Sequence, residues 1–185
     1  SSEEWLPIQV VSGGPDTYWN PIKESYLKLI TLATESVYIQ TPYFIPDESI
    51  LDALRMAALS GIDVRIMMPA KPDHWFVYWA GYSYAEQLID AGVRVYTYDS
   101  GFIHAKTIVV DGTASVGSAN WDVRSYRLNF ETNAIMYDTR IARRLRDEYK
   151  KDLEVCSELT AERLASLPKK IRLKMSVSRI FSPLL

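Results

Sequence analysis

Four polar side chains recur at a spacing of two along residues 103–120, which read IHAKTIVVDGTASVGSAN. His104 and Lys106 precede a β-branched run and an Asp-Gly turn dipeptide, and Ser118 and Asn120 follow on the return strand. Because alternate side chains of a strand project from one face, each pair can reach the same anion. An imidazole, an ammonium, a hydroxyl and an amide on one hairpin predict a phosphate site built around a nucleophile.

This pattern resembles the signature of the phospholipase D superfamily, in which His-x-Lys is followed after four residues by Asp and later by Gly-Ser-x-Asn. The chain reads His104-Ala-Lys106, then Asp111-Gly112, then Gly117-Ser118-Ala119-Asn120. Three further segments narrow the resemblance to the C-terminal half of bacterial cardiolipin synthases: TPYFIPDESI at 41–50, AKPDHWFVYWA at 70–80 and RLNFETNAIMYD at 127–138.

The resemblance implies a role for each polar residue of the signature. His104 would attack phosphorus and form a phosphohistidine. Lys106, Ser118 and Asn120 would bind the non-bridging phosphate oxygens and stabilise the charge that develops on them. Glu131 in NFETNA matches the downstream carboxylate of the family, which would orient the nucleophilic histidine, and a surface salt bridge is the alternative.

The turn departs from the family pattern at one point, and the departure has a geometric consequence. The family has six residues between Asp and Gly, whereas five residues separate Asp111 from Gly117. With a two-residue loop, even positions on one strand share a face with odd positions on the other, and all four site residues are even. We therefore predict a three-residue connection over 111–113 or a bulge before Gly117. By resemblance Asp111 counts with the catalytic residues, but its place at the turn favours a residue that fixes the hairpin.

A displacement of this kind needs a second histidine, which protonates the leaving alkoxide and later deprotonates the acceptor. The chain has one other histidine, His74, which lies outside any matching signature, so capping or packing at a helix start is its favoured role. The resemblance implies that the partner histidine comes from a first phospholipase-D-like half of the same protein or from a twin subunit. No metal or other cofactor is expected, because two histidines and one cysteine show no metal-ligand spacing.

The activity implied by the resemblance is phosphatidyl transfer from one phosphatidylglycerol to another, with release of glycerol. Two alternatives stay open. The first is another enzyme with the same site, either a phospholipase D or a single-motif dimeric phosphodiesterase or nuclease. The second is a non-catalytic half that completes a partner domain.

Charge is distributed unevenly along the chain. Residues 1–137 carry 9 basic and 16 acidic side chains, and residues 138–185 carry 12 basic and 7 acidic ones. Duplex nucleic acid favours a broad basic face, so no nucleic-acid partner is expected. The basic tail fits an anionic membrane surface. We expect a location at the cytoplasmic face of the bacterial cell membrane, with the chain itself soluble because it has no run of eighteen apolar residues.

Alternating strand and helix patterns predict an α/β fold, a phospholipase-D-like α/β/α sandwich whose mixed sheet is flanked by helices. Strands are predicted over 7–11, 36–41, 64–68, 93–98, the hairpin and 129–137, and helices over 21–33, 47–61, 75–91, 139–154 and 160–168, with caps at Asn20, Asp47 and Thr160. We assign residues 1–158 to a phospholipase-D-like domain and residues 159–185 to a basic helical tail. The tail either lies on anionic lipid or packs on the missing half.

Overall fold

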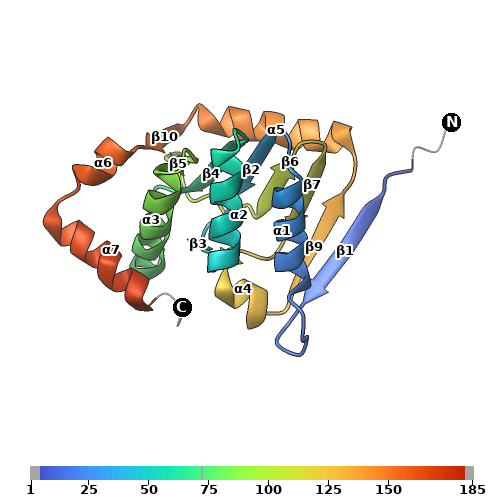
Figure 1. The fold of residues 1–185 in the computed structure, drawn as a ribbon, viewed down its shortest axis with the longest axis horizontal. Coiled ribbons are helices and arrows are strands. Elements are labelled where there is room, and N and C mark those ends of the chain that lie inside the picture. The colour runs from blue at the N-terminus through green and yellow to red at the C-terminus, as the bar shows by residue number, and fades with distance from the viewer. Residues whose placement is uncertain (1–4, 72, 182–185) are drawn as a thin grey trace.

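The computed structural model describes residues 5–71 and 73–181, which fold around an eight-stranded mixed sheet (Figure 1). The sheet has the strand order β1-β9-β7-β6-β2-β4-β5-β10, and a second, two-stranded sheet joins β3 to β8. The strands are β1 (Ile8–Gly13), β2 (Ser36–Gln40), β3 (Phe44–Ile45), β4 (Asp63–Pro69), β5 (Arg94–Tyr98), β6 (Thr107–Val110), β7 (Thr113–Gly117), β8 (Trp121–Asp122), β9 (Glu131–Met136) and β10 (Cys156–Leu159). The helices are α1 (Pro21–Leu32), α2 (Glu48–Leu59), α3 (Trp75–Ile89), α4 (Val123–Arg127), α5 (Thr139–Leu153), α6 (Ala161–Ala165) and α7 (Lys169–Phe181).

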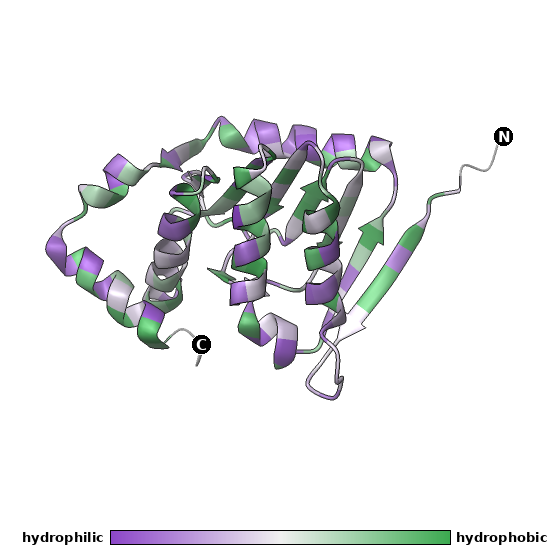
Figure 2. Cartoon of the chain, in the orientation of Figure 1, coloured by the Kyte–Doolittle hydropathy of each residue, from purple (hydrophilic) through white to green (hydrophobic). Residues whose placement is uncertain are grey.

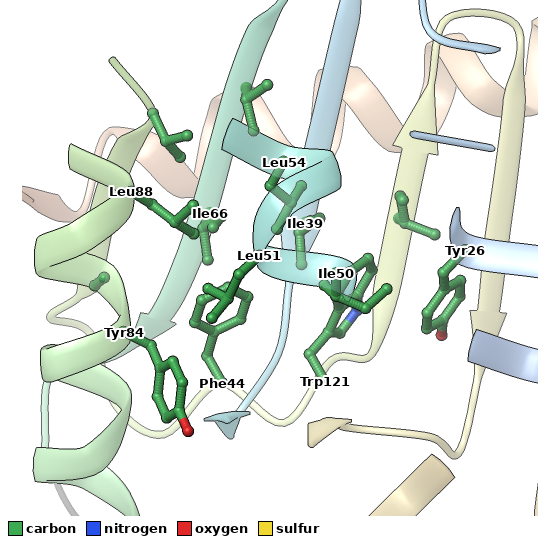
Figure 3. Close-up of a cluster of buried hydrophobic side chains, with 14 of the residues drawn as sticks. Tyr26, Ile39, Phe44, Ile50, Leu51, Leu54, Ile66, Tyr84, Leu88 and Trp121 are labelled. Atoms are coloured by element: carbon green, nitrogen blue, oxygen red, sulfur yellow. The ribbon is translucent and has the colours of Figure 1, made fainter. Parts of the chain in front are cut away.

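Helices α1, α2 and α3 cover one face of the sheet, and α5 covers the other (Figure 1). Side chains alternate along β2, so that Ile39 joins the core beneath the three helices and Tyr38 joins the core beneath α5. In the larger core Trp121 stacks on Tyr26 with ring centroids 4.5 Å apart, and Figure 3 shows both rings among the aliphatic side chains of α2 and the sheet. The predicted α/β/α sandwich with a mixed sheet is confirmed.

Side-chain hydrogen bonds mark the starts of several helices. The Asp47 carboxylate accepts from the backbone N–H of Ile50 at 3.2 Å, which confirms the predicted cap of α2. Thr160 caps α6 in the same manner. Asn20 holds the predicted N-cap position of α1, directly before Pro21, but its side chain makes no capping hydrogen bond. The Glu24 carboxylate, in the first turn of α1, instead accepts a hydrogen bond from the backbone N–H of Asn20 at 3.3 Å.

The β6–β7 hairpin has a regular two-residue turn, so the predicted three-residue connection or bulge is wrong. Val110 pairs with Thr113, and the same register holds to the bond from the Gly117 N–H to the Lys106 carbonyl. Asp111 adopts a left-handed conformation with φ of +47°, which the short turn requires and Asp tolerates. Ser118 and Asn120 lie beyond the last β6–β7 pair, so the number of residues in the turn does not decide which way their side chains face.

Several short elements near the hairpin escaped the sequence pattern. The strand predicted over 129–137 is β9, which is preceded by the helix α4. Asp122 starts this helix by accepting a hydrogen bond from the backbone N–H of Ser125 at 2.7 Å. The strands β3 and β8 pair in parallel, with Phe44 opposite Trp121. Two-residue strands carry no periodicity that a sequence pattern can reveal.

The C-terminal region packs against the rest of the chain. The strand β10 pairs with β5, and α7 lies along α3 with Met175 and Ser178 buried (Figure 1). The predicted boundary between residues 158 and 159 falls inside β10, and the division into domain and tail stays a prediction. Its outer ends, 1–4 and 182–185, lie outside the described residues. Within the ranges that the structure describes, no helix is long and apolar enough to cross a membrane.

Candidate active site

The predicted site gathers at one edge of the sheet. The parallel strands β2, β4 and β5 end at this edge, as does β7, while the antiparallel strands β6 and β9 begin there. The chain order therefore brings His104 and Lys106, just before β6, next to Ser118, just after β7, and to Glu131 at the start of β9. Ligands of open α/β sheets bind at such an edge, beyond the carboxyl ends of the strands.

Lys106 and His104 contact each other directly. The Lys106 Nζ lies 3.2 Å from each ring nitrogen of His104 and 3.0 Å from the His104 carbonyl oxygen. The imidazole is exposed, whereas the lysine is half-buried. Burial lowers the pKa of the Lys106 ammonium, and the carboxylates of Glu131 and Asp122 partly oppose that effect. The pair thus combines a solvent-accessible imidazole with a cation that is partly removed from water.

Glu131 is fixed by neighbours other than the histidine. Ser118 Oγ donates a short hydrogen bond to one carboxylate oxygen, and the Asn129 amide donates to the other at 3.3 Å. Ser118 Oγ also accepts from the Thr132 N–H at 3.0 Å, which fixes the Ser118 side chain against β9. Among the described residues Glu131 makes no hydrogen bond to His104, so its predicted contact with the imidazole is not seen.

Ser118 and Asn120 do not converge on Lys106 directly. Within the described ranges neither side chain contacts the Lys106 ammonium. Ser118 is linked to Lys106 through Glu131, which accepts a hydrogen bond from the Ser118 hydroxyl and attracts the ammonium. Asn120 is directed to a different feature, a cavity of about 420 Å³ lined by Tyr43, Ile45, His74, Phe76, Val77, Asn120, Asp122, Arg124 and Asn129. The phosphate-binding roles of both residues stay predictions.

Asp122 was not singled out by the sequence pattern, although it belongs to this site. Its side chain is buried, and burial raises the pKa of its carboxyl against the hydrogen bonds from Ser125 and Asn120. Asp122 lines the cavity and also acts electrostatically on Lys106. A lowered lysine pKa near a raised carboxyl pKa, with that carboxyl in the wall of a cavity, is typical of a functional site.

The buried Asn133 side chain supports the loop between Gly117 and Asn120. Its buried amide donates to the Tyr26 hydroxyl at 2.7 Å and to Ser115 Oγ at 3.3 Å, and its carbonyl oxygen accepts from the Ala119 N–H at 3.4 Å. A Cβ atom at Gly117 would lie 2.3 Å from Asn133 Cγ, so only glycine allows this close approach. The one available sequence signal was an amide inside the strand segment ETNAIM.

Asp111 lies at the opposite edge of the sheet. The four residues of β6 separate it from the His104–Lys106 pair, which is roughly 15 Å of extended chain. Its carboxylate accepts from the N–H groups of Thr34, Glu35 and Ser36 and from the Thr34 hydroxyl, at 2.7 to 3.1 Å. Burial would raise the pKa of Asp111, but these donors lower it below the ordinary carboxyl value. The contacts match a residue that fixes the hairpin.

His74 immediately precedes α3 and lines the cavity, where its ring centroid lies 6.5 Å from that of Tyr43. Its side chain makes no capping hydrogen bond, so the predicted capping role is not seen. The neighbouring Asp73 accepts a short hydrogen bond from the Tyr43 hydroxyl. Within the described part of the chain, no group of three or more His, Cys, Asp or Glu side chains could hold a metal ion.

Comparison with known proteins places the chain in a family. Residues 26–153 match the family described as the phospholipase-D-like domain of cardiolipin synthase. The chain belongs to this family. The major cardiolipin synthase of Bacillus subtilis is 59% identical over 179 residues, which cover 96% of this chain and 37% of that enzyme. The chain therefore spans little more than a third of the length of this relative.

Two solved structures share the fold of this phospholipase-D-like domain. Phosphatidylserine synthase of Haemophilus influenzae has a TM-score of 0.74 at 16% identity, and the match covers 97% of this chain and 48% of that one. Nuc, a phospholipase D family member from Salmonella typhimurium, has a TM-score of 0.70 at 21% identity, over 84% of this chain and 99% of that one. At these identities the likeness shows the fold alone.

Proposed function

We propose that the chain is the C-terminal catalytic half of a cardiolipin synthase, which transfers a phosphatidyl group between two phosphatidylglycerol molecules and releases glycerol. The contact between His104 and Lys106 at the carboxyl edge of the sheet, beside a cavity, carries this proposal. Its support from comparison is the 59% identity to a cardiolipin synthase over nearly the whole chain.

In the first step one ring nitrogen of His104 attacks the phosphorus of phosphatidylglycerol. A P–N bond forms, the P–O bond to the headgroup glycerol breaks, and glycerol leaves after taking a proton from a general acid. The Lys106 ammonium, 3.2 Å from the imidazole, neutralises charge that develops on the non-bridging oxygens. Ser118 and Asn120 add donors to those oxygens, and Glu131 attracts and orients the ammonium.

In the second step a headgroup hydroxyl of another phosphatidylglycerol attacks the phosphohistidine. A new P–O bond forms, the P–N bond breaks, and the hydroxyl proton returns to the base that had served as the acid. The first phospholipase-D-like half of the same protein, or a twin subunit, supplies this acid and base. Water as the acceptor would yield phosphatidic acid from the same site, which is the phospholipase D reaction.

The substrates define where the protein works. Phosphatidylglycerol is an anionic lipid, and the basic C-terminal region offers the complementary charge. We place the active edge at the cytoplasmic face of the bacterial membrane. The relative from Bacillus subtilis is a cardiolipin synthase, which supports this location.

A chimera tests the proposed function. The chain replaces the segment that aligns with it in the Bacillus subtilis enzyme, and the purified chimera is incubated with phosphatidylglycerol vesicles. Glycerol and cardiolipin formed in equal amounts support the proposal. Phosphatidic acid as the sole lipid product would instead identify a phospholipase D, and a folded chimera without either product would identify a half that does not catalyse the reaction. The unmodified Bacillus enzyme, assayed under the same conditions, is the control.

A further inference from the structure

Helix α7 presents two apolar faces, of which one is used inside the chain. Met175 and Ser178 are buried against α3, and Arg179 lies over the Tyr84 ring of that helix at 4.6 Å. On the opposite side, Leu173, Val177 and Ile180 follow the i, i+4, i+7 spacing of a single helix face and are 64%, 37% and 72% exposed. A surface helix ordinarily turns polar side chains to solvent on that side.

The exposed face continues onto the start of α3. Phe181 at the end of α7 lies 6.1 Å from Phe76 between ring centroids, and Phe76 lies 5.0 Å from Trp75. The Trp75 side chain is 54% exposed, and the Lys174 ammonium lies 5.9 Å from its ring centroid. Figure 1 shows the end of α7 beside the start of α3, and Figure 2 shows hydrophobic and hydrophilic bands alternating along α7. We call this patch, formed by Leu173, Val177, Ile180, Phe181 and Trp75, the α7 face.

The charge of α7 has one sign. Its thirteen residues include five basic side chains, Lys169, Lys170, Arg172, Lys174 and Arg179, and no acidic one. Lys170 and Lys174 are exposed and flank the apolar residues of the α7 face. An apolar stripe bordered by lysines, with a tryptophan at its edge, is the composition of a helix that lies in the headgroup region of a membrane.

The α7 face adjoins the candidate active site. Phe76, which contacts Phe181, is also a wall of the cavity that contains Asn120 and Asp122. We propose that the α7 face docks on the surface of an anionic phospholipid bilayer and turns the mouth of this cavity towards the lipid. The lysines contact lipid phosphates, while Leu173, Ile180 and Trp75 enter the boundary between headgroups and acyl chains. Only the choice of phosphatidylglycerol as the anionic lipid rests on the proposed function.

Vesicle binding without turnover tests the docking. The purified chain is mixed with vesicles of phosphatidylcholine alone or of an equal mixture with phosphatidylglycerol, and the bound fraction is measured by sedimentation. We expect binding to the mixed vesicles that weakens with added salt. The double variant Lys170→Glu/Lys174→Glu should lower the partition coefficient at least about 20-fold. The matched control Lys28→Glu/Lys150→Glu makes the same charge change at exposed lysines of α1 and α5 and should bind at least tenfold more tightly than that variant.

A second pair of variants tests the apolar contact. Leu173→Ser/Ile180→Ser should weaken binding about tenfold, because two exposed aliphatic side chains no longer enter the lipid. Leu59→Ser, at an exposed leucine at the end of α2, is the control. Brominated acyl chains should quench a tryptophan component that Trp75→Phe removes. Unchanged thermal melting of each variant confirms that the fold is intact.

Contrary outcomes separate the docking from the proposed function. Equal binding of all variants, or absence of binding to the mixed vesicles, overturns the docking. Weakened association of the α7 variants with the first half of the relative, at unchanged vesicle binding, would assign the face to that partner instead. When the α7 substitutions are made in the chimera, loss of turnover on vesicles together with retained turnover on detergent-dispersed lipid supports docking. A chimera that binds vesicles but forms no product leaves docking in place and overturns the proposed function.

Discussion

The two ends of the β6–β7 hairpin serve opposite purposes. At the turn, the Asp111 carboxylate accepts four hydrogen bonds from residues 34–36, where β2 begins, and Arg146 donates to the Asp111 carbonyl oxygen. At the open end, His104 is exposed and Lys106 holds an ammonium that is partly desolvated. The fully bonded end stabilises the register. Under the proposed function, the sparsely bonded end keeps its donors available for a phosphate, so residues of one signature divide between stability and chemistry.

The largest effect is expected at the open end. His104→Ala in the chimera should lower glycerol release at least about a thousandfold, because the nucleophile is lost. The free energy of unfolding should change by less than about 0.5 kcal/mol, because the imidazole is exposed. Glycerol release and urea unfolding measured on the same preparation check both expectations. His74→Ala is the matched control, and an equal loss of activity there would break the comparison.

Lys106→Met should lower activity about a hundredfold by removing the cation that stabilises the developing charge. Stability should be unchanged or slightly higher, since folding lowers the pKa of this lysine and so disfavours its charged form. That penalty is present below the folded pKa and is relieved as pH rises towards the ordinary lysine value. The alkaline limb of the pH–rate profile should therefore lie below that value, and Lys106→Arg should move it upward. If the alkaline limb stays at the same pH in Lys106→Arg, the titration belongs to another group.

At the turn, the expected effect is on stability. Asp111→Ala should lower the free energy of unfolding by about 2 kcal/mol, because several donors lose a charged acceptor. The folded pKa of Asp111 is lowered, so its contribution is present above the ordinary carboxyl pKa and is lost as pH falls through the folded value. Urea unfolding across that acidic range should show a smaller pH dependence for the variant. Turnover per folded molecule should stay near the unmodified value, and a specific loss of turnover would give Asp111 a role in the chemistry.

The smallest effect is expected at Ser118. Ser118→Ala removes a donor to Glu131 and an acceptor for the Thr132 N–H, and we expect about a tenfold loss of activity. Ser12→Ala is the matched control, because Ser12 Oγ bonds the Thr132 hydroxyl at 3.0 Å. Equal rates for the two variants would show that the link from Ser118 to Glu131 does not serve the reaction.

Local signals were sufficient to predict much of this architecture. The order of the long helices and strands follows from hydrophobic periodicity, and the caps at Asp47 and Thr160 follow from residue type. The pairing of His104 with Lys106 needed no distant residue, because two positions of separation place them together. The place of Asp111 at the turn followed from the Asp-Gly dipeptide for the same reason.

Long-range contacts set the rest of the site. The parity argument assumed that Ser118 still belongs to the hairpin, whereas the chain has left β6 by then and bonds to Thr132 of β9. Asn133 bonds to Tyr26 across 107 positions, and Asp122 enters the site through pairing of β8 with β3. Tyr26 and Asn133, like β3 and β8, lie too far apart in the sequence for a local pattern to reveal their contact.

Isolation of the covalent intermediate tests the central claim most directly. The active chimera is mixed with phosphatidylglycerol, quenched during turnover, and digested for mass spectrometry of the peptides that contain His104 and His74. We predict a phosphatidyl adduct on His104 that is absent from His104→Ala, together with the loss of glycerol release. An adduct on His74, or continued turnover in His104→Ala, would contradict the assignment of His104 as the nucleophile.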